Sequence, residues 1–251
     1  MTDIGSNAVL SVFVLFCRIG SCLMLMPGFS SDRVPVNVRL FVALSITLAL
    51  TPLLGPEVQP SFIHASAIEL IKLLLSEVLI GILIGFLGRI FFAALETLAT
   101  SIAMGIGLSS ALGAPIDEME PLPAISTLIT LTATVLLFVM DLHWEILHGI
   151  VASYQALPVS TGFGAQFGLI QIADCLSKAF FLSLRVSSPF IAFAIIVNLS
   201  VGLTNKLTPQ IPIFFISAPF IVAGGLFLFY FSFKQFIELF MAGFETWLRT
   251  G

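Results

Sequence analysis

Charge is the scarcest property of this chain of 251 residues, because only 10% of them are Asp, Glu, Lys or Arg. An ordinary soluble domain carries about 25%. The net charge is −4, and the few basic residues are scattered rather than clustered, which excludes the basic patch typical of a nucleic-acid-binding protein. Cysteine is also rare. The three cysteines, all in or beside apolar runs, indicate small buried hydrophobic residues rather than a disulfide framework.

Motifs for catalysis and for metal or cofactor binding are missing as well. In the stretch DLHWEILH, His143 and His148 are five residues apart, whereas a zincin helix needs two histidines four apart, with Glu beside the first. The segment GFGAQFG at 162–168 lacks the preceding strand and the glycine spacing of a dinucleotide-binding loop. A GxSxG nucleophile motif does not occur. We therefore expect no enzyme activity, no cofactor and no metal site.

Long apolar runs take the place of these features. Apolar residues make up 58% of the chain, and the mean hydropathy is +1.12, more than a globular core of this size can hide. The runs are continuous, which favours helices over the alternating strands of an outer-membrane barrel. Because a spanning helix needs roughly 20 apolar residues, we expect an all-α integral membrane protein with about six hydrophobic helices. The candidate spans are Ala8–Met26, Val36–Leu54, Ile68–Leu87, Leu122–Met140, Phe180–Leu203 and Ile211–Phe231.

Shorter apolar segments complete the expected fold. They are too short to span comfortably, so we expect them to form separate bent, amphipathic or re-entrant helices, at 98–112, 146–157 and 236–248. The N-terminal MTDIGSNAV has an acidic residue and no basic region, so the first run is expected to stay as a helix rather than to be removed as a signal peptide.

Two charged residues lie deep in apolar runs, Arg18 in the first and Glu77 in the third. Ionisable groups at membrane depth usually face a protein interior or water, because exposing them to hydrocarbon costs several kcal/mol. Both are candidates for burial with a partner. The sequence does not indicate which group each would pair with.

Glycine and proline mark two further candidates. Gly81 and Gly85 form a GxxxG pair, a spacing that lets two helices approach closely, within this chain or with another. The segment LTNKLTPQIPIFFISAP at 203–219 contains three prolines. We expect a short turn at Pro209 and Pro212, with Asn205 and Gln210 capping chain ends. We expect a kink at Pro219, because proline removes a backbone donor from the helix.

A loop is predicted where GIGLSSALGAPIDEMEPLP combines glycine, proline and acidic residues, at 105–123. Two interpretations are open for it, a solvated connection and a functional loop that lines a cavity. We expect a single membrane domain, 1–251, with N-terminal helices in 1–113, an acidic loop in 114–121 and C-terminal helices in 122–251.

Four segments, in order and over nearly the whole chain, resemble the FliR family of flagellar biosynthetic proteins and its counterparts in virulence type III secretion. They are PGFSSDRVPVNVRL (27–40), SEVLIGILIGF (76–86), DLHWEILHGIVASYQALPVS (141–160) and GLTNKLTPQIPIFFISAPF (202–220). The residues that fit the family's pattern are Pro27, Val34, Pro35, Arg39, Glu77, Gly81, Gly85, His143, Ser153, Leu157, Pro158, Asn205, Pro209, Gln210, Phe214 and Pro219.

The resemblance implies a gating subunit rather than an enzyme. In that family a single copy joins several copies of FliP and FliQ, in bent helical hairpins, to build the type III export gate through which unfolded proteins pass. It also implies FlhB-like and FlhA-like partners and a multi-pass location in the bacterial inner membrane, at the flagellar basal body. The implied plug of the channel contains Gly105, Gly107, Gly113, Pro115, Asp117, Glu118 and Glu120.

Two alternatives to a flagellar export subunit are open. One is the corresponding subunit of a virulence injectisome, which the same segments resemble. The other is a secondary transporter, which would have internal repeats with paired helix interruptions. We find no convincing pair of that kind in the sequence.

Overall fold

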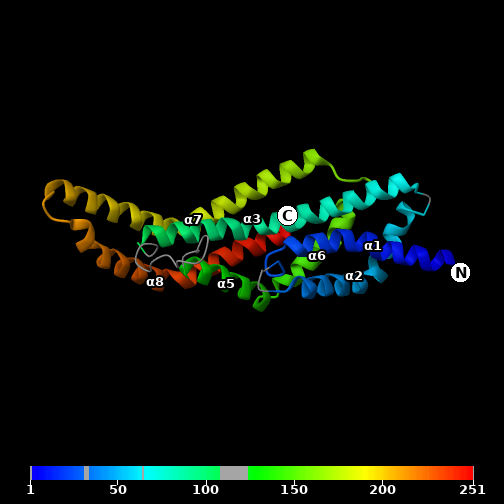
Figure 1. The fold of residues 1–251 in the computed structure, drawn as a ribbon, viewed down its shortest axis with the longest axis horizontal. Helices are drawn as coiled ribbons and strands as arrows, with labels where there is room; N and C mark the ends of the chain where they lie inside the picture. The colour runs from blue at the N-terminus through cyan, green and yellow to red at the C-terminus, as the bar shows by residue number, and fades with distance from the viewer. Residues whose placement is uncertain (1, 31–33, 64, 108–123, 251) are drawn as a thin grey trace. The chain divides into compact units, whose positions relative to one another are not determined.

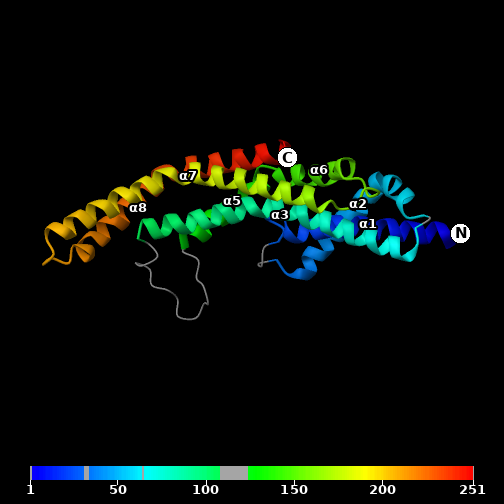
Figure 2. The ribbon, with the colours of Figure 1, turned by 90° about the horizontal axis from the view of Figure 1, so that it is seen from above.

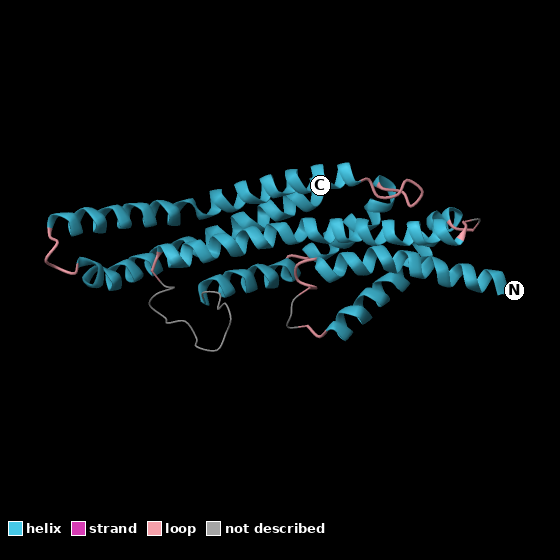
Figure 3. Ribbon diagram, turned by 45° about the horizontal axis from the view of Figure 1, so that its top comes forward, coloured by secondary structure: helices cyan, strands magenta, loops and turns pink. Residues whose placement is uncertain are grey.

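Helices joined by short connections make up the described part of the chain (Figures 1 and 3). The computed structural model describes residues 2–30, 34–63, 65–107 and 124–250. Within these ranges no β-strand occurs, and the prediction of an all-α membrane protein is confirmed.

Among the described residues, five helices are long and apolar enough to cross a membrane. They are α1 (Thr2–Leu25), α2 (Val36–Val58), α3 (Ala67–Gly105), α7 (Ala165–Leu207) and α8 (Ile213–Thr250). A short 3₁₀ helix, η1 (Gln59–Ser61), follows α2 directly.

A bent pair of helices provides the sixth candidate span. The helices α5 (Ala124–Val139) and α6 (Leu142–Ala156) meet at an angle of 72°. The break falls at Asp141, whose φ of 58° lies in the left-handed region, which a short polar side chain such as Asp adopts more readily than most residues. Five spans, or six with this pair, agree with the predicted number.

Several predicted helix boundaries were wrong. The segments 68–87 and 98–112 were expected to be separate, but α3 runs unbroken through both as far as Gly105. In the same way, 236–248 is not a separate helix but part of α8. The polar residues between the apolar runs lower the local hydropathy, but residues such as Arg89 and Lys234 are good helix formers. A dip in hydropathy therefore did not mark a helix end.

Residue contacts divide the chain into two compact units. The first unit extends up to Phe91 and also contains Leu137–Ser177 and the residues from Leu248 onward. It includes α1, α2, η1 and α6 together with the N-terminal parts of α3 and α7. Figures 1 and 2 show α1 lying along the N-terminal part of α3. The buried core of this unit includes Val14, Leu15, Ile19, Cys22, Ile80, Ile146 and Ile150.

The second unit contains Phe92–Leu136 and Lys178–Trp247, and its core is aromatic. The ring of Phe92 meets those of Phe240 and Phe244 edge to face, with centroids 5.8 and 5.5 Å apart. Phe190 and Phe236 make a similar pair at 6.1 Å. Such edge-to-face pairs are favourable beyond the area they bury, so they help to hold α3, α7 and α8 together in this unit.

Candidate functional site: a buried ion pair in the first unit

The first unit buries a charged pair between α1 and α3. The side chains of Arg18 and Glu77 are both 0% exposed. Arg18 Nε donates to Glu77 Oε2, and Arg18 Nη2 donates to Glu77 Oε1, each over 2.7 Å. This two-pronged geometry is the strong form of the arginine–carboxylate interaction. The two deep charges singled out in the sequence are therefore each other's partners.

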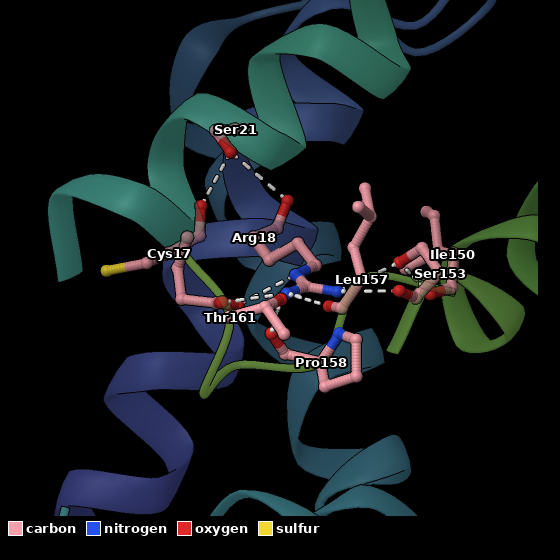
Figure 4. Close-up of polar contacts among 9 residues, drawn as sticks. Cys17, Arg18, Ser21, Ile150, Ser153, Leu157, Pro158 and Thr161 are labelled. Atoms are coloured by element: carbon pink, nitrogen blue, oxygen red, sulfur yellow. Dashed lines mark hydrogen bonds and ion pairs between the residues drawn. The ribbon is translucent and has the colours of Figure 1, made fainter. Parts of the chain in front are cut away.

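The rest of the guanidinium holds the end of α6 (Figure 4). Arg18 Nη1 donates to the carbonyl of Ser153 over 3.1 Å and to its Oγ over 3.3 Å, and Nη2 donates to the carbonyl of Leu157 over 3.0 Å. The carbonyl of Ser153 also accepts from the backbone N–H of Leu157 over 2.8 Å, whereas the carbonyl of Leu157 lies just past the helix end, where carbonyls lack an intrahelical donor. Arg18 therefore caps α6. All five N–H groups of the side chain thus have acceptors within the protein.

An aromatic ring covers the same arginine. The Cζ atom of Arg18 lies 4.0 Å from the centroid of the Tyr154 ring, within the range of a cation–π interaction. Tyr154 was not predicted, because a single tyrosine in an apolar stretch matches no motif. Ser153 and Leu157 stood out only through the family resemblance, since a backbone carbonyl that binds a distant arginine leaves no signal in the residue type.

Glycines allow α1 and α3 to approach closely enough for this pair to form. Gly81 lies one turn after Glu77, and a Cβ atom built there would collide with the carbonyl of Arg18 and with Ser21 Oγ. At Gly85 a Cβ would lie 2.5 Å from the carbonyl of Cys22. Gly88, which the GxxxG pattern did not include, faces Met26 at similarly close range. The helices meet backbone to backbone, as expected for small residues at this spacing.

The candidate loop is described only at its start. Gly105 is the last residue of α3 rather than a loop residue, because a single glycine costs a helix only about 1 kcal/mol. Gly107 has a φ of +75° and follows the end of the helix. Five candidates lie outside the described residues, namely Gly113, Pro115, Asp117, Glu118 and Glu120.

The proline candidates belong to the second unit. Pro209 and Gln210 lie in the turn between α7 and α8, where the backbone N–H of Ile211 donates to the carbonyl of Thr208 over 3.2 Å. Pro219 lies inside α8, which continues past it to Thr250. Of the predicted candidates, the structure brings together Arg18, Glu77, Gly81 and Gly85.

The chemistry open to this site is structural. The charged groups are sealed from solvent, and the guanidinium has no N–H left over for a substrate. Within the described ranges, no group of three or more His, Cys, Asp or Glu side chains is placed to hold a metal ion. The pair therefore joins α1, α3 and α6.

Comparison with known proteins identifies relatives over nearly the whole length. A sequence model of the family described as "Bacterial export proteins, family 1" matches residues 9–247. The chain is 30% identical to the flagellar biosynthetic protein FliR of Caulobacter vibrioides over 213 aligned residues. This alignment covers 85% of this chain and 84% of that protein. It is 26% identical over 209 residues to FliR of Escherichia coli K12, and the alignment covers 83% of this chain and 78% of that protein. For FliR of Bacillus subtilis the identity is 23% over 225 residues, and the alignment covers 86% of this chain and 85% of that protein.

Proposed function

This chain belongs to family 1 of the bacterial export proteins, and we propose that it is a structural and gating subunit of a type III protein export gate. In this function, unfolded substrates leave the cell through a central channel to which the chain contributes. The observation that carries the proposal is the family match over residues 9–247, which extends over both units and every described helix.

The geometry of the buried site supports a scaffold rather than a secondary transporter. In a transporter, ionisable groups at membrane depth line the pathway of the substrate or the coupling ion. Here Arg18 and Glu77 are 0% exposed, and each satisfies the other. An interaction of this kind fixes the crossing of two helices, which suits a subunit that must keep its shape within an assembly.

The names of the relatives favour the flagellar apparatus over a virulence injectisome, since all three are flagellar biosynthetic proteins. The chain is a multi-pass membrane protein of this apparatus. We place it in the bacterial inner membrane at the basal body, with FliP-like and FliQ-like subunits as direct partners and FlhB-like and FlhA-like components nearby. It acts as one membrane domain, without catalysis of its own.

The gating part of the proposal concerns the acidic loop in 114–121. Its three acids exclude it from lipid, and the FliR resemblance assigns it to the plug that closes the channel. The alternative is a solvated connector, which tolerates shortening as surface loops usually do.

A strain that lacks the chain tests both parts. We expect this strain to stop exporting flagellar proteins into the medium while still making them, and the wild-type chain to restore export. A chain shortened by a few residues within 114–121 should still assemble, but should make the membrane permeable to ions or to a small molecule that is normally excluded. The readouts are exported flagellar protein and ion conductance. Normal export by the deletion strain would refute the proposed function, whereas a tight membrane with normal export in the shortened variant would refute only the plug.

A further inference from the structure

One exposed face of α7 in the second unit combines apolar residues with an arginine. The residues of this face follow one another in alternating steps of four and three, the spacing that keeps side chains on one side of a helix. We call the face the α7 seam, and its residues, all exposed, are Phe181, Arg185, Ser188, Ala192, Ile195 and Leu199. Phe181 is 67% exposed, and Ile195 and Leu199 are each 61% exposed. Large apolar side chains gathered in this way indicate a surface that another molecule covers.

The guanidinium of Arg185 has no partner within the described ranges, where it forms neither a hydrogen bond nor an ion pair. Its backbone carbonyl, in contrast, is satisfied. Pro189 lies inside α7 and has no N–H to donate to that carbonyl, and Ser188 Oγ donates to it instead, over 2.9 Å. The side chain therefore retains a positive charge and five unused N–H groups. Because enclosing an unpaired charge among apolar groups is costly, whatever covers the α7 seam must supply a counter-charge.

The shape of the α7 seam favours a helix as its cover. Ser188 and Ala192 are small, lie four residues apart and directly follow Arg185 along the seam. Small residues at this spacing let the backbone of a second helix approach closely, which an acyl chain does not require. Ile195 and Leu199 also line a largely apolar groove of about 450 Å³. Its opposite wall belongs to α3 and contains Leu98, Ser101 and Ile102. Such a groove accepts the bulky side chains of a helix laid along the seam.

We propose that the α7 seam docks an apolar helix of another subunit, and that this helix carries a carboxylate which pairs with Arg185. The guanidinium donates two N–H groups to the carboxylate, in the geometry that Arg18 and Glu77 already show within the chain. A lipid phosphate would also offset the charge, but it would leave the small residues of the seam without a role. This inference rests on the proposed function, since a subunit of an export gate has membrane partners that supply such a helix.

A crosslink from the α7 seam identifies what covers it. The tagged full-length chain, with p-benzoylphenylalanine in place of Phe181, is coexpressed with the FliP-like and FliQ-like subunits and irradiated in membranes. Mass spectrometry then identifies the crosslinked product. Because Arg185 lies one turn after Phe181, we expect a crosslink to an apolar segment of one of these subunits, with Asp or Glu within about two turns. A crosslink to lipid, to this same chain or to a segment without an acid would overturn the proposal, as would the absence of a crosslink.

Charge variants test the ion pair itself. Arg185→Gln should weaken retention of the two subunits at least about tenfold, as the loss of one partner from an enclosed charge pair does. The amount of the chain in membranes should stay the same, because Arg185 is exposed. The matched control is Lys234→Gln, which should leave retention unchanged. Lys234 is an exposed cation of the same unit, and Glu238 of the same helix lies 3.8 Å from it.

Exchanging the charges gives the most specific result. Arg185→Glu should abolish retention, and lysine in place of the acid that the crosslink identifies should restore it. If Arg185→Gln and Arg185→Glu retain both subunits as well as the wild type does, the α7 seam is not the docking surface, while the proposed function stands. A wild-type chain that retains neither subunit would refute the proposed function and the seam together.

Discussion

Replacing Arg18 with methionine is expected to destabilise the protein by about 3–5 kcal/mol, the cost typical of removing one partner of a buried ion pair. The change leaves the carboxylate of Glu77 fully buried without its counter-charge. It also removes the donors to the carbonyls of Ser153 and Leu157. The measurement is the unfolding of the purified protein in detergent, together with its steady-state level in membranes.

The control is Lys206→Met. Lys206 is exposed in the last turn of α7, at the end of its apolar segment, so its loss should change stability by only a few tenths of a kcal/mol. The double variant Arg18→Met/Glu77→Gln should be more stable than Arg18→Met alone, because it buries no unpaired charge. It should still fall short of the wild type, because the end of α6 stays uncapped. Equal stability of Arg18→Met and Lys206→Met would show that the buried pair does not hold the unit together.

Leucine in place of Gly81 or Gly85 is expected to prevent α1 from packing against α3. We expect the complex to assemble poorly as a result. At both positions even a Cβ atom would come too close to the backbone of α1, which cannot move aside as the end of a flexible side chain can. Overpacking of a core usually destabilises a protein by about 1–3 kcal/mol. Because the collision here is with backbone, we expect a destabilisation at or above the upper end of that range. Synthesis of the chain should change little, so the measurement compares total chain with chain recovered in the complex.

Gly149→Leu serves as the control for both glycine variants. Gly149 is also a helical glycine of the first unit, but a Cβ atom there would meet nothing within 4 Å. We expect this variant to assemble normally. If Gly81→Leu and Gly85→Leu also assemble and support export normally, the close crossing of α1 and α3 is not required.

The sequence predicted those parts of the fold that follow from local hydropathy. The six runs long enough to span could be recognised because lipid demands continuous apolar helix. Helix ends were harder to place. Arg89 and Glu96 lower the hydropathy within α3 without interrupting its hydrogen bonding, and only contacts with other helices decide whether such a segment continues.

The site was predictable in its charges but not in its pairing. Arg18 and Glu77 stood out because charge at that depth is costly, yet 59 residues separate them, and no local pattern links residues so far apart. The carbonyl of Leu157 is 139 residues from Arg18. Any residue other than leucine would present a similar carbonyl, so this contact has no signature in the sequence.

Co-purification tests the central claim, that the chain is a subunit of an export gate, most directly. The tagged chain is expressed alone or with its FliP-like and FliQ-like partners, extracted in mild detergent and analysed by size-exclusion chromatography and mass spectrometry. The account predicts a discrete complex that contains all three proteins, and an unstable, protease-sensitive chain when the partners are absent. A well-behaved, protease-resistant monomer that retains neither partner on coexpression would contradict it.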